Sequence, residues 1–313
     1  MEEKPRCFRV LWHTGIERPK TRYLKRGFEH YGIEVRKDPR LIRKFAPPTN
    51  RLGPYVYPLS FLFEGGKTVT VLFDIGTNPD LFHMSPDGRG RPDFYFKIHI
   101  RKGHKLARHK KVRVFPNSVS NHEDYYNLLA ATRNLVDNGV YINDLFFVGW
   151  NDDKGLRERV VRLILKEGDA RRSKWRVYAG LQAFKHHKKV PKELRINRLP
   201  FDIFMAWLGG SKLNLAMPGG FKEPWMSFRH VEIWGTGATM LSPPSTCILP
   251  GKPGDSWVEF NPNLKHFREL VDHYLNSPDE LAKIGQRGRR YFEEYLSPES
   301  HARYMIQTIG GRI

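Results

Sequence analysis

The chain has 313 residues, 40% of them hydrophobic, which is enough for two cores of ordinary size, so we expect two globular domains. Lysine and arginine number 53 against 33 aspartate and glutamate, and the net charge of +20 favours polyanionic partners such as nucleic acid, anionic lipid headgroups or acidic glycans. The only cysteines, Cys7 and Cys247, are too few for a disulfide framework or a thiolate metal site, and no apolar run reaches the ~18–20 residues of a membrane span.

A βαβ unit opens the chain. Residues 8–12 read as a buried strand, residues 21–31 as a helix ended by Gly32, and residues 33–36 as a second strand. This opening is typical of a doubly wound α/β domain, in which ligands bind at the carboxyl edge of the sheet. His13 directly follows the first strand, so we place it at that edge, where an imidazole suits the removal of a hydroxyl proton. A histidine hydrogen-bonded at a strand end is the alternative.

A β-hairpin is the clearest local signal in the chain. Residues 60–63 and 68–73 are strand-like, and Gly65-Gly66 supplies the turn between them. Asp74 closes the second strand. Its carboxylate is either a general base at the edge of the sheet or a cap for the following turn, and the turn composition favours the cap.

The most basic region begins in the next predicted strand, residues 93–100. From residue 97 to residue 113 there is no acid, and the cationic residues are Lys97, Arg101, Lys102, Lys105, Arg108, Lys110, Lys111 and Arg113. Such a block is either a solvated surface or a patch that faces a polyanion. Three histidines in it lack an accompanying carboxylate or cysteine, so the pattern predicts no metal site.

The domain boundary is predicted in the turn-forming residues 115–121, which gives domains of residues 1–118 and 119–313. A helix follows over residues 122–137. An apolar strand then ends in Gly149, and a polar loop leads into a helix that ends near Lys166. The first half of the chain is the more basic one, because residues 1–140 carry a net charge of +12 and residues 141–313 carry +8.

One further βαβ unit, residues 211–243, organises the second half. It comprises a strand over residues 212–217, a turn at Pro218-Gly219-Gly220, a helix that opens near Ser227, and a strand over residues 238–242. Backbone N–H groups at the start of such a helix attract phosphate. Arg229 and Glu232 lie three residues apart, on one helical face. A guanidinium can clamp a diphosphate and a carboxylate can accept hydrogen bonds from a ribose diol, although a surface i,i+3 ion pair is the commoner fate of two such residues.

These residues resemble the donor-binding part of GT-B glycosyltransferases, especially the exostosin-like and spore-protein CgeB-like groups. The similarity rests on the Pro-Gly loop, on the S-x-R-x-x-E helix formed by Ser227, Arg229 and Glu232, and on the glycine before the next strand. It covers roughly residues 143–305. The strand and loop from residue 145 onward also resemble the F-V-G-R-L…K-G opening of these domains, with Trp150 in place of the arginine.

The resemblance implies two Rossmann-like domains that face each other across a cleft, the second binding a nucleotide-diphosphate sugar and the first an acceptor. Arg229 would then contact the diphosphate and Glu232 the ribose. Gly149, Pro218, Gly219, Gly220, Ser227 and Lys185 are the further expected donor-binding residues. Some inverting members use a base at the first domain's edge, which His13 or Asp74 would supply. The last helix of such enzymes crosses back to the first domain.

A glycosyl transfer to an anionic acceptor is therefore the predicted function. Candidate acceptors are a nucleic acid with a hydroxylated base, such as DNA, and a cell-surface polymer or lipid-linked glycan at an anionic membrane. The resemblance predicts no tightly bound cofactor. A non-catalytic polyanion-binding protein on a degenerate transferase fold is the alternative. The amino-terminal residues MEEKPRCF lack the apolar core of a signal peptide, so we expect the protein in the cytosol.

Overall fold

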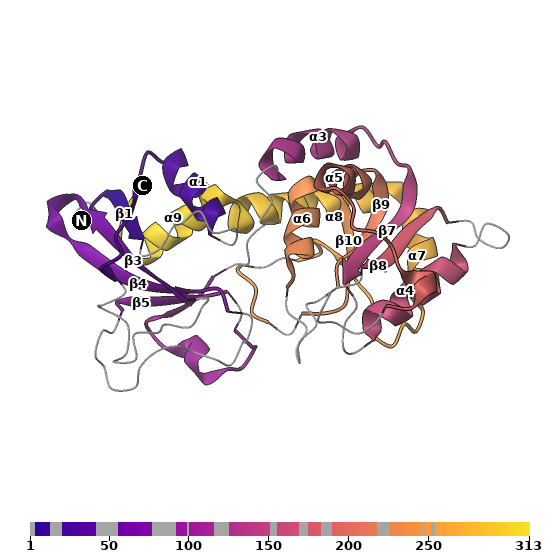
Figure 1. The fold of residues 1–313 in the computed structure, drawn as a ribbon, viewed down its shortest axis with the longest axis horizontal. Coiled ribbons are helices and arrows are strands. Elements are labelled where there is room, and N and C mark those ends of the chain that lie inside the picture. The colour runs from indigo at the N-terminus through magenta and orange to yellow at the C-terminus, as the bar shows by residue number, and fades with distance from the viewer. Residues whose placement is uncertain are drawn as a thin grey trace. The chain divides into compact units, whose positions relative to one another are not determined.

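A computed structural model describes residues 4–12, 21–41, 56–76, 92–98, 100–115, 125–150, 155–168, 175–182, 190–217, 226–245, 247–251 and 254–313. Its contacts divide the chain into two compact units (Figure 1). The first unit contains residues 1–121, 247–252 and 294–313, and the second contains residues 122–246 and 253–293. The predicted boundary after residue 118 lies close to the first of these divisions.

The first unit contains a six-stranded sheet in the order β2-β1-β3-β4-β5-β6. Its elements are β1 (Cys7–Trp12), α1 (Arg22–His30), β2 (Glu34–Lys37), β3 (Val56–Phe63), η1 (Glu64–Gly66), β4 (Thr68–Asp74), β5 (Phe94–Lys97), η2 (Lys105–Arg108), β6 (Val112–Val114) and α9 (Pro298–Thr308). The predicted hairpin is β3–β4. Gly65 and Gly66 both have positive φ in its turn, a conformation that glycine adopts without steric cost.

Strand β3 makes this sheet mixed. It runs antiparallel to both β1 and β4, whereas β1–β2, β4–β5 and β5–β6 are parallel. The α/β class is as predicted, but the sheet differs from the all-parallel sheet of a Rossmann-like domain, because the short turn between β3 and β4 forces these neighbours to run in opposite directions.

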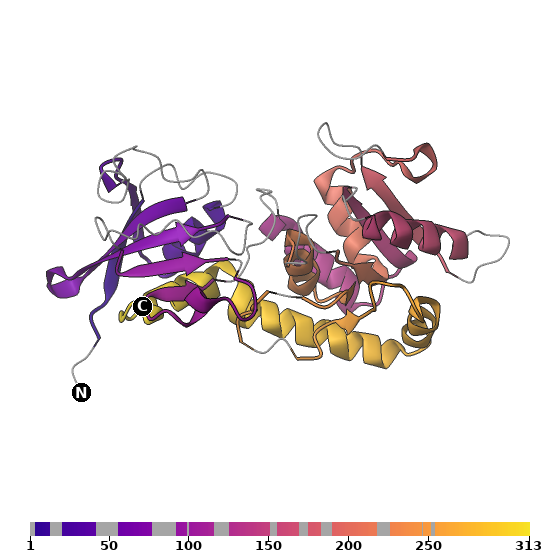
Figure 2. The same ribbon diagram turned by 90° about the horizontal axis from the view of Figure 1, so that it is seen from below.

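The carboxyl-terminal helix α9 belongs to the first unit and packs on α1. A Cβ atom at Gly27 in α1 would lie 2.0 Å from the carbonyl oxygen of Pro298, so only glycine permits this approach. Arg312 then forms a parallel bridge with Arg6, and the end of the chain lies beside the amino-terminal strands (Figures 1 and 2).

The second unit contains a fully parallel five-stranded sheet in the order β11-β10-β9-β7-β8. Its elements are α3 (Tyr125–Asp137), β7 (Asn143–Trp150), α4 (Leu156–Glu167), β8 (Val177–Gln182), η3 (Lys192–Leu194), α5 (Phe201–Gly209), β9 (Ser211–Leu215), α6 (Phe228–Thr236), β10 (Thr239–Ser242), β11 (Val258–Glu259), α7 (Phe267–Leu275) and α8 (Pro278–Tyr291). A π-helical stretch, η4 (Phe292–Leu296), follows α8.

Side chains alternate between the two faces of this sheet. Leu213 and Leu215 of β9 join a core with residues of α4, α7 and α8. On the opposite face Phe146 of β7 packs 5.6 Å, ring to ring, from Phe204 of α5. Both faces are therefore covered, as expected for a parallel sheet.

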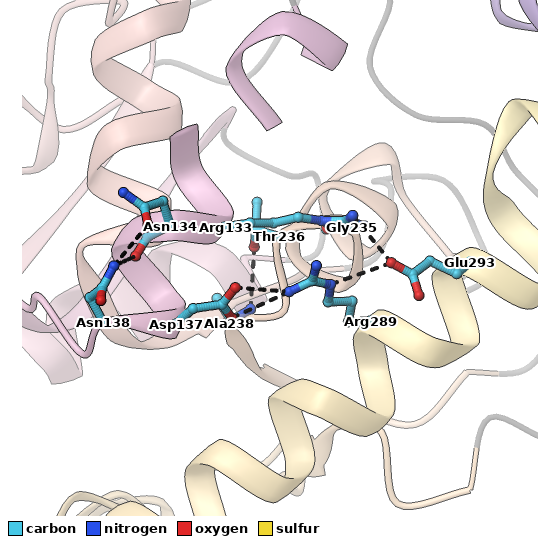
Figure 3. A network of polar contacts seen from close by, with 9 residues as sticks. All are labelled: Arg133, Asn134, Asp137, Asn138, Gly235, Thr236, Ala238, Arg289 and Glu293. Carbon is cyan, nitrogen blue, oxygen red and sulfur yellow. Dashed lines mark hydrogen bonds and ion pairs between the residues drawn. The ribbon is translucent and has the colours of Figure 1, made fainter. Parts of the chain in front are cut away.

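A network of polar contacts surrounds the carboxyl end of α6 in the second unit (Figure 3). Arg133 of α3 donates to the carbonyl oxygen of Gly235 at 2.7 Å and pairs with Glu293 at 3.2 Å. Arg289 of α8 pairs with Asp137 of α3 at 3.1 Å. Helices from the beginning and the end of this unit are thus joined around the last turn of α6, whose terminal carbonyl groups need donors from elsewhere.

Candidate functional site

The carboxyl edge of the second sheet is the expected ligand-binding edge. From β7 the chain first adds β8 on one side and later returns to add β9 on the other side. The strand order therefore reverses between β7 and β9, and in open α/β sheets ligands bind outside the carboxyl ends of the strands at such a switch point. β7 ends at Trp150 and β9 ends at Leu215.

Helix α6 begins at this edge. Ser227 is its N-cap residue, in an extended conformation, and the helix starts one residue later, as the sequence predicts. The backbone N–H of Ser227 donates to Nδ1 of His230 at 3.1 Å. The Nε2 atom of His230 lies 2.9 Å from Oγ of Ser242, the last residue of β10. His230 thereby joins the start of α6 to the end of β10.

His230 is uncharged in this arrangement. Burial lowers its pKa to about 3, the hydrogen bond with Ser227 opposes that shift, and the charges of Arg157 and Arg229 add to it. Because Nδ1 accepts from Ser227, the proton of the neutral ring is on Nε2 and is donated to Ser242. The Ser242 hydroxyl in turn donates to the carbonyl oxygen of Pro243 at 2.9 Å.

Arg229 and Glu232 are bonded to each other. Nη1 of Arg229 lies 2.8 Å from Oε2 of Glu232. The ion pair that the sequence offered as the alternative is therefore formed, but it is not a surface pair, since the side chain of Glu232 is 7% exposed and that of Arg229 is 23% exposed. Their donor-binding roles stay a prediction.

Two further contacts fix the guanidinium of Arg229. Its Nη2 atom donates to the carbonyl oxygen of Val148 in β7 at 3.3 Å. Its Cζ atom lies 3.8 Å from the centre of the Phe204 ring, a cation–π contact. The side chain therefore reaches from α6 to Val148, near the carboxyl end of β7 and beside the switch point.

Arg157 is a cation that the sequence interpretation missed. It lies in the first turn of α4 and donates to the carbonyl oxygen of Trp150 at 2.8 Å and to that of Met217 at 3.5 Å. These two carbonyl groups belong to the ends of the segments on either side of the switch point. Only its place in the first helical turn after a strand could have indicated it.

The other predicted donor-binding residues divide into two groups. Gly149 is in β7, where a Cβ atom would lie 2.9 Å from the Phe147 ring, and Ser227 caps α6. Lys185 and the turn of Pro218, Gly219 and Gly220 lie outside the described residues, as does the predicted base His13. Of the predicted donor-binding residues, Ser227, Arg229 and Glu232 lie together at the start of α6, and Arg229 contacts Val148 of β7.

Asp74, the other predicted base, is fully buried in the first unit. Its Oδ2 atom accepts from the ammonium group of Lys97 at 2.9 Å and from the hydroxyl of Tyr95, and its Oδ1 accepts from the backbone N–H of Gly76 at 2.7 Å. The bond to Gly76 is the cap that the sequence favoured. A carboxylate engaged in this way is held as an ion-pair partner, so we do not assign it proton transfer.

The prediction that Lys97 belongs to the polyanion patch is wrong. Its side chain is 1% exposed and pairs with Asp74, so it does not contribute to a basic surface. Four other members of the patch are exposed, namely Lys102, Lys105, Arg108 and Lys110. Arg101, Lys111 and Arg113 are partly buried, and Arg113 also lies over the Phe94 ring, with its Cζ atom 5.5 Å from the ring centre.

The basic segment is an ordered part of the first unit. Ile100 and Ala107 pack into a core cluster with Tyr95 of β5. Arg101 forms an antiparallel bridge with Cys247, and Ile100 accepts a backbone hydrogen bond from Ile248 at 3.0 Å. The exposed cations are therefore carried on a fixed backbone between β5 and β6.

Neither a metal site nor a membrane span is found in the described part of the chain. There, His, Cys, Asp and Glu side chains form no group of three that could hold an ion. Among the same residues, none of the helices combines the length and apolar character that crossing a bilayer requires.

Comparison with known proteins concerns mainly the second half of the chain. The family described as glycosyl transferase-like matches residues 157–307. No curated protein matches the sequence. Among solved structures, HepE of Anabaena in complex with UDP and glucose is similar at 11% identity and a TM-score of 0.48, over 70% of this chain and 63% of that one.

The matched region contains α4 from Arg157 onward, β9 and the whole of α6, whereas β7 precedes it. The predicted resemblance to glycosyltransferases is thereby confirmed at the level of the family, while the exostosin-like and CgeB-like groups stay a prediction. Residues 157–307 of this chain are similar to the glycosyl transferase-like family.

Proposed function

We propose that this protein transfers a sugar from a nucleotide-diphosphate donor to a hydroxyl group of an acceptor. The observation that carries the proposal is the buried, bonded pair of Arg229 and Glu232 in the first two turns of α6, fixed against the end of β7. Arg229 and the amino end of α6 would neutralise the diphosphate as negative charge develops on it. Glu232 would orient the ribose of the donor.

A screen of nucleotide-diphosphate sugars tests the proposal. We expect at least one donor to bind and to be hydrolysed or transferred. Arg229→Lys keeps a cation beside Glu232 but removes the planar fork, so it should lower kcat by roughly 10²-fold or more while the protein stays folded. Arg162→Lys, in an exposed pair on α4, is the matched control. A wild-type protein without affinity for any such sugar would contradict the proposal.

A general base is required only if the reaction inverts the anomeric carbon. Because Asp74 is committed to Lys97, we assign this role to His13. His13→Gln should abolish sugar transfer and leave donor binding intact, and isothermal titration calorimetry measures the binding. Unchanged sugar transfer by this variant would show that His13 is not the general base.

An anionic acceptor is the second part of the proposal. Its support is the ordered segment that carries Lys102, Lys105, Arg108 and Lys110 on the first unit. When such cations neutralise the charges of a polyanion, counterions are released from the polyanion, and the entropy of this release favours binding. The acceptor is then a nucleic acid with a hydroxylated base, or a cell-surface polymer or lipid-linked glycan on an anionic membrane.

Salt dependence distinguishes these acceptors. Binding to duplex DNA should weaken steeply between low and moderate salt, and replacing the four exposed cations with glutamine should reduce the slope of log K against log salt by up to ~4. Vesicles with anionic lipid provide the parallel arm. DNA binding that is absent or insensitive to salt removes the nucleic-acid acceptor, and binding to vesicles alone favours the membrane-associated glycan.

A non-catalytic polyanion-binding protein is the second candidate function. One observation favours it: Trp150, 47% exposed, stands where the family pattern has an arginine. In that case the four-glutamine variant would lose DNA or vesicle binding, and no nucleotide sugar would bind to the wild-type protein. The donor screen therefore separates the two functions.

A further inference from the structure

Arg157 spans the two strand ends at the switch point. Its Nη1 atom donates to Trp150 and its Nη2 atom donates to Met217, so one guanidinium is held by carbonyl groups from the last residue of β7 and from the segment that follows β9. These acceptors are 67 residues apart in sequence. Their common donor fixes the head of Arg157 at the edge where ligands of such sheets bind.

Arg157 also lies near the start of α6. The charge of Arg157 and the charge of Arg229 both disfavour protonation of His230, which is bonded to the N-cap residue of that helix. Hydrogen bonds place both side chains on one strand, since Arg229 donates to the carbonyl oxygen of Val148 and Arg157 donates to that of Trp150, two residues further along β7. Two guanidiniums from different helices, α4 and α6, are therefore anchored at the carboxyl end of the same strand.

A cation also lies beside Trp150, where the family pattern has an arginine. The family pattern places a cation at the end of this strand, whereas Trp150 has an exposed indole there. The carbonyl group of Trp150 instead anchors a cation from the next helix. That cation comes from a residue seven positions later in the chain.

We propose that Arg157 is a second diphosphate-binding residue of the donor site and acts together with Arg229. The proposal rests on the proposed transferase function and names the ligand group that these two residues share. Two guanidiniums on different helices suit a diphosphate, which offers oxygen atoms on both phosphorus atoms, better than a single phosphate. The backbone carbonyl groups of Trp150 and Met217 pre-position the fork of Arg157.

Titration with inorganic pyrophosphate and with inorganic phosphate tests this. The wild-type protein should bind pyrophosphate more tightly than phosphate, and Arg157→Gln should weaken pyrophosphate binding by roughly 10- to 100-fold, the worth of a charge-assisted contact. The pyrophosphate affinity of Arg157→Lys should lie between those of the wild type and Arg157→Gln. Arg159→Gln is the control on the same helix, since Arg159 is exposed and donates to Pro262 instead.

Three results would overturn the assignment: equal affinity for the two anions, an Arg157→Gln variant that binds pyrophosphate like the wild type, and an equal loss in Arg159→Gln. Circular dichroism and Tm show whether each variant is folded, and Arg157→Lys preserves the test if the glutamine variant is not. Donor turnover with an unchanged KM in Arg157→Gln would refute this role alone. Absence of all nucleotide-sugar binding in the wild type would refute the proposed function.

Discussion

The free energy that the Arg229–Glu232 ion pair contributes to folding can be predicted from its burial and measured. Replacing Arg229 with methionine keeps apolar contact with Phe204 but leaves the buried carboxylate of Glu232 without its cation. Loss of one partner from a buried pair costs about 3–5 kcal/mol, and we expect the lower end because Arg229 retains some exposure. Glu232→Gln alone should cost about 2–3 kcal/mol, and the double variant distinctly less than the sum.

Urea unfolding followed by tryptophan fluorescence measures these free energies. Six of the seven tryptophans lie between residues 150 and 257, so the signal reports mainly on the second unit. We expect a coupling energy of about 2 kcal/mol for the buried pair. The more exposed i,i+4 pair of Glu158 and Arg162 is the control, with a coupling of about 0.3–0.5 kcal/mol. Equal coupling in the two pairs would refute the claim that burial distinguishes the first.

Three other expectations follow from the described contacts. Burial lowers the pKa of His230 and of His301 to about 3, below the 6.5 of an ordinary histidine. The unfolded chain therefore binds these protons at a higher pH than the folded protein does, and the free energy of unfolding decreases as pH falls from 6.5 toward 3. The loss should reach ~1.4 kcal/mol per pH unit per histidine, and a urea midpoint that is flat between pH 7 and pH 5 would contradict it. Asp74→Ala should destabilise the first unit by about 3–5 kcal/mol, with most of the loss recovered by adding Lys97→Met, as chemical unfolding would show. Arg133→Gln should cost only about 1–2 kcal/mol, measured as a shift in Tm, because its ion pair is partly exposed.

Local signals in the sequence were sufficient for most elements. The glycine pair at residues 65–66 predicted the hairpin, and the apolar run before Gly149 predicted β7. The helix predicted to open near Ser227 is α6, which has Ser227 as its N-cap residue. These features depend on turn conformation, side-chain period and capping, all of which are set within a few residues of the chain.

Pairing between distant segments was not available from such signals. Lys97 is placed among eight cations in sequence, yet in the fold it lies beside Asp74 in the register of β4 and β5. An opposite charge in the neighbouring strand, 23 residues away, decides its environment. For Arg157 the deciding acceptors are backbone carbonyl groups, which every residue has, so no pattern of side chains could identify them.

The bond between Arg229 and Glu232 is compatible with the ligand roles proposed for them. A guanidinium has five N–H donors, and the contacts with Glu232 and Val148 use one on each Nη atom. The remaining donors still include a pair suited to a phosphate oxygen. Glu232 likewise uses Oε2 for Arg229, and a ribose hydroxyl can donate to Oε1. A surface pair would exchange its partner for water, whereas this buried pair holds each side chain in one orientation. In the proposed donor site, a pair formed before binding lowers the entropy lost when the nucleotide binds.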